Sequence, residues 1–174
     1  MRRALFALML ALAGCGVTSA PEVAEPPARV LAGSLNAASA NARAVTGGLT
    51  IQRAGLMFSN GIALYTRTLA PRRGGDVITS SGDSYAAAAL GPSDLLIELR
   101  HVIEQSVPEG LVGLCGAEQP AYVALAYDEG AASVTLLVFS GDEAPGPNAT
   151  QSRLCARYAY AAPDGARTRE GVVL

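Results

Sequence analysis

Alternation of apolar and polar residues is clearest in the last third of the chain. Residues 121–127 and 133–139 are rich in β-branched and aromatic side chains, and the turn sequence Asp-Glu-Gly at 128–130 separates them. Two such runs joined by a short glycine-containing turn predict a β-hairpin. Residues 153–160 alternate in the same way. They predict a further strand after a long loop that is rich in glycine and proline.

An earlier pair of apolar segments predicts a second hairpin. Residues 49–59 and 62–69 flank Asn60-Gly61, a dipeptide that favours a tight turn because both residues readily adopt positive φ. A register with Ser59 opposite Ile62 leaves apolar side chains on both faces of this hairpin. We therefore expect it to be central, or packed on both sides.

The segment 94–104 fits two patterns. As a strand it alternates regularly, and as a helix it would begin at a Ser93 or Asp94 cap after Pro92. The alternation favours the strand. With about six to eight short strands and few convincing helices, the chain is predicted to be mainly β, with a β-rich α+β arrangement as the alternative. We expect a small antiparallel sandwich or barrel-like sheet.

The first fifteen residues follow a different pattern. Arg2 and Arg3 precede an unbroken apolar run over residues 4–12, and Ala13-Gly14-Cys15 follows it. At about 1.5 Å of helix rise per residue, this run covers roughly half of a membrane's hydrocarbon core. A positive flank, a short apolar core and small residues before a cut are typical of a secretory signal.

The last residues of this segment, Leu12-Ala13-Gly14-Cys15, resemble the lipobox of bacterial prolipoproteins. The resemblance implies that the Cys15 thiol receives a diacylglyceryl group, that signal peptidase II cuts before Cys15, and that the new amine is acylated. Two or three acyl chains hold a protein firmly on a membrane. Gly16 stands where an aspartate would indicate inner-membrane retention, so the resemblance favours the periplasmic face of the outer membrane. An ordinary signal peptide with a chance cysteine is the alternative.

Four segments follow from these patterns. Residues 1–14 are the expected signal peptide. Residues 15–46 are predicted to be the lipidated N-terminus and a flexible tether, because they are poor in large apolar side chains and interrupted by proline. Residues 28–44 have the spacing of a short helix of low stability. Residues 47–162 form the expected β-rich domain, and residues 163–174 a weakly ordered tail.

Cysteine usage agrees with export. After Cys15 only Cys115 and Cys155 remain, and an even pair in an oxidising compartment predicts a disulfide. The bridge would close a loop of about 40 residues, for which the chain-entropy model gives about 3–4 kcal/mol. A redox pair or a metal site is the weaker alternative. The chain has no Cys-x-x-Cys motif, and His101 is its only histidine.

Charge narrows the set of partners. Every basic residue is an arginine, and loss of Arg2 and Arg3 with the signal leaves 11 arginines against 15 acidic residues, a net charge near −4. The arginines are scattered and form no basic stripe. We therefore expect no nucleic-acid partner. No cofactor motif occurs, and we expect neither a cofactor nor a metal.

Few residues suggest chemistry. His101, with Glu98 and Glu104 nearby in sequence, is the acid–base candidate, but its apolar neighbours favour a partly buried structural histidine. The loop 140–150 is the predicted binding loop, because long loops on rigid sheets often carry function. Its candidate contact residues are Asp142, Glu143 and Asn148.

Three functions fit these features. The first is a non-enzymatic binding or accessory module of the envelope, attached to the membrane through lipid on Cys15, with an envelope protein or the cell wall as partner. A sharper version of this function is an inhibitor of a wall-degrading enzyme. The chain resembles membrane-bound lysozyme inhibitors, and it resembles them in architecture alone. The alternative is a periplasmic hydrolase of glycan or peptidoglycan that uses an unrecognised carboxylate pair. The third is a structural accessory in assembly.

Overall fold

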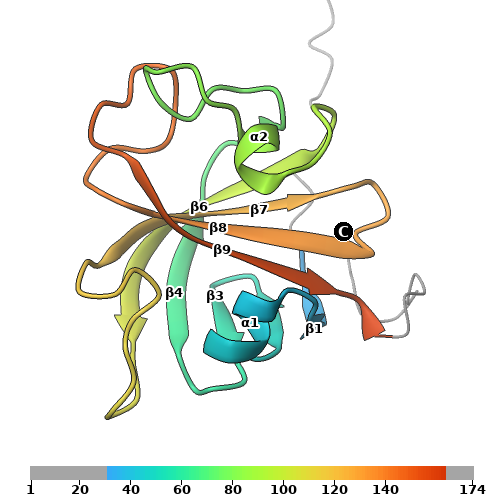
Figure 1. Ribbon diagram of the computed structural model, residues 1–174, viewed down its shortest axis with the longest axis vertical. Coiled ribbons are helices and arrows are strands. Elements are labelled where there is room, and N and C mark those ends of the chain that lie inside the picture. Colours follow the sequence, from blue (N-terminus) through green and yellow to red (C-terminus); the bar gives the residue numbers. More distant parts are fainter. Residues whose placement is uncertain (1–30, 164–174) are drawn as a thin grey trace, which may run out of the picture.

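The computed structural model describes residues 31–163 of the chain (Figure 1). Cys15, the expected signal peptide of residues 1–14 and residues 164–174 of the expected tail lie outside the described residues. The described part confirms the prediction of a mainly β, barrel-like antiparallel sheet, because it forms a closed β-barrel of eight strands with one extra strand.

The barrel follows the chain in order. Each strand pairs antiparallel with the next one along the ring, β4 pairs with β6, and β9 returns to β1 to close it. The short β5 (Arg72–Arg73) pairs with β6 outside the ring. The eight barrel strands are β1 (Gly33–Ala37), β2 (Leu49–Gln52), β3 (Gly55–Phe58), β4 (Ala63–Thr68), β6 (Leu96–Ser106), β7 (Pro120–Tyr127), β8 (Ser133–Ser140) and β9 (Arg153–Ala161).

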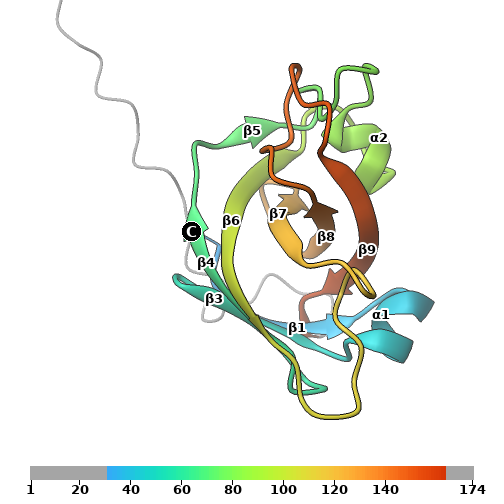
Figure 2. The same ribbon diagram turned by 90° about the vertical axis from the view of Figure 1, so that its left-hand side faces the viewer.

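Apolar side chains fill the barrel interior, and a second cluster lies outside its wall. Figure 2 shows the ring of strands with α1 (Ala40–Val45) and α2 (Tyr85–Ala89) on its outside. Full burial of one large apolar side chain is worth about 1.5–3 kcal/mol, so both clusters stabilise the fold. The interior includes Leu35, Ile51, Leu64, Leu125, Leu136 and Tyr160, and the outer cluster, under α2, includes Ile97, Leu99, Leu137, Phe139 and Tyr85.

The strand interpretation of residues 94–104 is confirmed by β6. Its side chains alternate between the two clusters, with Val102 in the barrel interior and Ile97 and Leu99 under α2. Both faces of the strand are therefore buried over much of its length. The two predicted C-terminal hairpin strands are likewise present as β7 and β8.

The boundary of the domain differs from the sequence prediction. Residues 31–46, which were expected to belong to a flexible tether, contain β1 and α1 and form part of the barrel. β1 closes the ring between β2 and β9, and Leu31 and Leu35 are buried in the interior. A five-residue strand is too short for alternation to stand out in a segment rich in alanine, asparagine and serine.

The first hairpin forms with a register shifted by one residue. A turn at residues 53–54 divides the expected long strand into β2 and β3. Met57 faces Ala63, whereas the predicted register, with Ser59 opposite Ile62, would place it opposite Leu64. Phe58 bonds to Ile62 across a three-residue loop in which Gly61 has φ +93°. Because side chains alternate along a strand, the observed register exposes Met57.

Candidate functional site

The predicted binding loop between β8 and β9 is docked against the rest of the protein. The Tyr85 hydroxyl donates to the Pro145 carbonyl at 3.1 Å, and the Ser80 N–H donates to the Ala149 carbonyl at 3.0 Å. Burial raises the pKa of Tyr85 to about 12, so this hydroxyl stays a donor over the whole neutral range. The loop is therefore held against the segment that leads into α2.

The three candidate residues of this loop have different surroundings. Glu143 Oε2 accepts from the N–H groups of Thr150 (2.7 Å) and Gln151 (3.0 Å), and these bonds lower the pKa of its carboxyl. Glu143 therefore shapes its own loop. The side chains of Asp142 and Asn148 are exposed, and no hydrogen bond within residues 31–163 joins either of them to Glu143.

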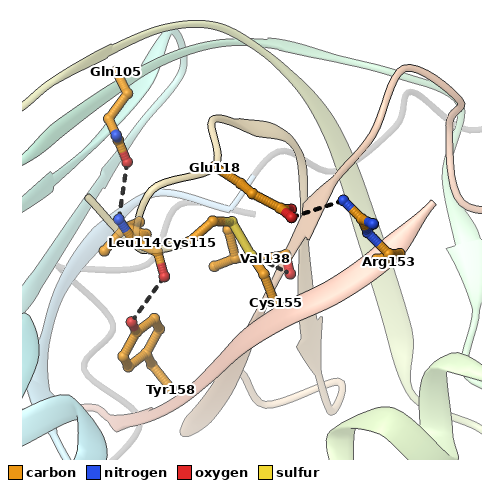
Figure 3. The surroundings of a disulfide bond; sticks show 8 residues. All are labelled: Gln105, Leu114, Cys115, Glu118, Val138, Arg153, Cys155 and Tyr158. Atoms are coloured by element: carbon orange, nitrogen blue, oxygen red, sulfur yellow. Dashed lines mark hydrogen bonds and ion pairs between the residues drawn. A yellow bond between two sulfur atoms is a disulfide. The ribbon is translucent and has the colours of Figure 1, made fainter. Parts of the chain in front are cut away.

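The predicted disulfide is confirmed. Cys115, in the loop between β6 and β7, is bonded to Cys155 on β9, with 5.2 Å between their Cα atoms. Figure 3 also shows a hydrogen bond and an ion pair near the disulfide. The Tyr158 hydroxyl donates to the Leu114 carbonyl at 3.4 Å, and Arg153 pairs with Glu118 at 2.8 Å. These contacts fix the β6–β7 loop to β9.

His101 and Glu98 lie on opposite sides of the barrel wall. His101 is opposite Arg67 on β4, and its ring contacts that of Tyr122 at a centroid distance of 5.1 Å. Glu98 is buried on the interior side. The structure thus does not bring His101 and Glu98 together as an acid–base pair.

Glu98 instead forms a buried ion pair with Arg100, whose Nη2 lies 2.6 Å from Glu98 Oε1. Arg100 also donates to the carbonyls of Gln52 (2.6 Å) and Leu31 (3.3 Å). The second oxygen of Glu98 accepts from the Leu31 N–H at 2.7 Å. Both main-chain groups of Leu31 are therefore held by one charge pair, which we call the Leu31 clamp.

A groove of about 560 Å³ lies on the outer wall of the barrel, over β9 and between α1 and α2. Figure 1 shows β9 passing between the two helices. This volume is within the usual range of ligand-binding clefts, about 300–1,000 Å³. The lining contains no carboxylate and is made by Ser39, Asn41, Ala88, Ala89, Leu90, Thr135, Leu154, Cys155, Ala156, Arg157 and Ala159.

Leu90, at the edge of this groove, has an unfavourable conformation. It ends α2 in the left-handed region (φ 56°, ψ 44°) and its side chain is 75% exposed. A non-glycine residue in this region costs roughly 1–2 kcal/mol, and glycine is the usual residue at such a helix end. The chain therefore places a large apolar side chain in water at a position where glycine would be less strained.

Arg157 supplies the only charge in the lining. Its side chain is exposed, and its Nη1 donates to the Ala88 carbonyl at 3.4 Å. The Arg157 carbonyl accepts from Asn41 Nδ2 at 3.0 Å. Among the described residues the guanidinium thus has no carboxylate partner, and the Ala88 carbonyl is the one acceptor to which it donates.

Sequence reasoning missed this groove because four segments that are distant in sequence form it, residues 39–41, 88–90 and 154–159 together with Thr135 on β8. No local pattern marks Leu90, because Gly91 and Pro92 directly after it are themselves the usual end of a helix.

Comparisons with protein-family models, with curated proteins and with solved structures find no match for this chain. In residues 31–163 no helix is both long and apolar enough to cross a membrane. The same residues contain no cluster of three or more His, Cys, Asp or Glu side chains arranged to hold a metal ion.

Proposed function

We propose that this protein is a non-enzymatic binding module of the bacterial envelope, held on a membrane by lipid on Cys15. In this proposal it takes a segment of an envelope protein into the groove over β9. The observation that carries the proposal is Leu90, a strained and exposed apolar residue at the edge of a cleft of ligand-binding size.

Leu90 raises the free energy of the folded chain in two ways, through its strained backbone and through its exposed side chain. Strained backbone positions persist where the surrounding structure enforces them, and they cluster at sites that bind or react. Exposure of a leucine forgoes the free energy of its burial, about 1.5–3 kcal/mol. A partner that covers Leu90 would recover that free energy on binding.

The scaffold supports the same proposal. The groove floor is a barrel strand, and the disulfide fixes that strand to the β6–β7 loop. A rigid floor loses little conformational entropy when a ligand binds, which favours affinity. The barrel interior is filled by side chains, so a ligand of this groove binds on the outside wall.

The lipid anchor sets how far the module reaches. The described domain begins at Leu31, which leaves 16 residues from Cys15 to residue 30. Sixteen residues reach at most about 55 Å, since a fully extended chain spans about 3.3–3.6 Å per residue. The groove would then stay close to the membrane surface and meet envelope partners there. A wall-degrading enzyme is one such partner, and inhibition of it would follow if the bound segment were near its active site.

The hydrolase alternative stays a prediction, and the groove over β9 offers no site for it. The groove lining has no carboxylate. Glu98 is bonded within the Leu31 clamp, and Glu143 accepts hydrogen bonds from its own loop. No pair of acidic side chains in the described groove is available for glycosidic chemistry of the kind that needs two carboxylates.

The test is a photo-crosslinking experiment in the producing bacterium. Benzoylphenylalanine replaces Leu90 in one variant of the full chain and Val112 in a second, matched variant. Val112 is 68% exposed in the β6–β7 loop, outside the groove lining. We expect a discrete protein adduct, identified by mass spectrometry, from position 90 and none from position 112. Equal adducts at both positions, or none at position 90, would reject the proposed groove function.

The anchor is tested separately with Cys15→Ser. Metabolic labelling with palmitate should label the unaltered chain and not the variant, because the thiol is the acyl acceptor in this proposal. Labelling that persists in the variant would place the lipid elsewhere or reject it.

A further inference from the structure

We propose that the partner segment binds in the groove as an added β-strand along the free edge of β9, with an acidic side chain against Arg157. This inference rests on the proposed function and names the ligand: an extended, acidic peptide segment. Strand addition uses main-chain hydrogen bonds for affinity and side-chain contacts for specificity.

β9 has a free edge because its neighbour β1 is short. β1 pairs with β9 only at Asn36–Ala161 and Ala37–Tyr160. β8, on the other side of β9, pairs with it from residue 153 to residue 161. Within residues 31–163, β9 therefore has a strand on one side only over residues 153–158. An edge of this kind is a template for another strand.

The main-chain groups on this edge can be identified from Ala159. Its carbonyl accepts from the Ala38 N–H at 2.8 Å, and its N–H donates to Ser39 Oγ at 3.2 Å. Both groups thus point away from β8. Main-chain groups alternate along a strand, so those of Arg157 point to the same edge. The described chain places no strand beside the Arg157 N–H.

The Asn41 side chain already makes one of the hydrogen bonds that a strand beside β9 would make. Its Nδ2 donates to the Arg157 carbonyl at 3.0 Å, where the N–H of a neighbouring strand would donate. A side-chain amide has the same donor chemistry as a peptide group. An incoming strand can therefore replace this bond with one of its own and add a second bond from the Arg157 N–H.

The positive charge of Arg157 favours an acidic segment in the groove. Arg157 is the one charged residue of the lining, and its exposed guanidinium favours a carboxylate directly opposite on the added strand. A second copy of the chain, paired edge to edge about a two-fold axis at this position, would place Arg157 against Arg157. Like charges directly opposite are destabilising. An acidic peptide fits better than a second copy.

The probe is the capped peptide acetyl-Val-Glu-Val-Glu-Val-amide, which as a strand places its carboxylates on one face. It is titrated into the mature chain, residues 15–174 with Cys15→Ser, at low salt. We expect saturable binding with protection of the Arg157 amide from hydrogen exchange. Arg157→Glu should weaken binding about tenfold or more, because a charge-assisted contact becomes a repulsion. The matched reversal Arg67→Glu, on the opposite barrel wall, should leave affinity unchanged.

Methylated peptides and one further protein variant test the main-chain hydrogen bonds. Two peptides carry N-methyl groups on alternate amides, and they differ in which set of amides is methylated. At least one of them should bind about tenfold more weakly than the unmodified peptide, because methylation removes a hydrogen-bond donor. Asn41→Ala should bind the unmodified peptide at least as tightly as the unaltered chain, since its amide no longer competes for the Arg157 carbonyl. Folding of each variant is checked by its melting temperature.

Several results would overturn strand addition. These are equal binding by Arg157→Glu, equal binding of both methylated peptides, or protection at Leu111 and Val112 instead of Arg157. Protection that rises with protein concentration alone would assign the edge to a second copy. Protection that is present without peptide and lost on deletion of residues 164–174 would assign it to the chain's own tail. A specific adduct at position 90 together with any of these results would keep the proposed function and reject only the strand.

Discussion

Two arginines of this protein have opposite surroundings. Arg100 is 0% exposed in the barrel interior, where it pairs with Glu98 and donates to two carbonyls. Arg157 lies in the outer groove, with an exposed guanidinium and a single long bond to a carbonyl. A buried charge must be paired, or the fold loses several kcal/mol. An exposed charge stays solvated and costs little, so it remains available to a ligand.

The difference separates the structural part of the molecule from the part proposed to bind. The Leu31 clamp is a charge pair whose hydrogen bonds hold both main-chain groups of Leu31 in the barrel, and its Arg100 also donates to the Gln52 carbonyl. The groove leaves a cation and an exposed leucine without equivalent partners in the described chain. Substitutions in the two regions should therefore move different measurements.

The largest effect is expected from Arg100→Met. It leaves Glu98 as an unpaired buried charge, which should cost about 3–5 kcal/mol of unfolding free energy in urea titrations. The double variant Glu98→Leu/Arg100→Met removes both charges and should recover part of this loss. Arg157→Ala, the matched change in the groove, should cost less than about 0.5 kcal/mol. Similar losses for the two arginine variants would remove the distinction.

The next effect is expected from loss of the disulfide. Cys115→Ala/Cys155→Ala opens a loop with a sequence separation of 40 residues and should cost about 3–4 kcal/mol. Chemical denaturation of both proteins, with the unaltered chain also measured after reduction, checks the value. If reduction leaves the stability of the unaltered chain unchanged, the bridge contributes nothing to the groove floor.

A smaller effect is expected from Tyr85→Phe, which removes the bond that joins α2's first residue to the β8–β9 loop. The loss at neutral pH should be about 1 kcal/mol. Burial raises the pKa of Tyr85 from 10.0 to about 12. Its contribution is therefore full below pH 10 and is lost as the pH rises from 10 to 12, where the unfolded chain ionises first.

The measurement for this variant is the melting temperature across that alkaline range. Tyr85→Phe should lose less stability there than the unaltered chain. Burial also raises the pKa of Tyr160, so part of the alkaline loss should remain. Identical alkaline profiles would show that Tyr85 ionises as easily in the folded protein as in the unfolded chain.

The smallest effect apart from that of the control Arg157→Ala, and the only expected gain in stability, comes from Leu90→Gly. Glycine adopts φ 56° without strain, so stability should rise by about 0.5–1 kcal/mol. Binding of the acidic peptide should fall, because the apolar contact is lost. A variant that is more stable and binds equally well would show that Leu90 serves no ligand.

Much of the barrel was predictable because it depends on local patterns. The β7–β8 hairpin follows from β-branched and aromatic runs around a turn, and the alternation in β6 was sufficient to favour a strand over a helix. The register of the first hairpin was not predictable in detail. Asn60-Gly61 suits more than one turn length, and tertiary contacts such as the bond from Asn60 Nδ2 to the Val45 carbonyl act on that choice.

The sequence by itself determined the β-rich class, the pairing of Cys115 with Cys155 and the lipobox-like segment that ends at Cys15. These depend on residue identity, spacing and count. Only the tertiary structure decided that residues 31–46 belong to the barrel, that Glu98 and Arg100 hold Leu31, and that Leu90 and Arg157 share a groove. The reason is distance along the chain. Closure of the barrel brings residues 39–41, 88–90 and 154–159 together with Thr135, and no local pattern in any one of these segments refers to the others.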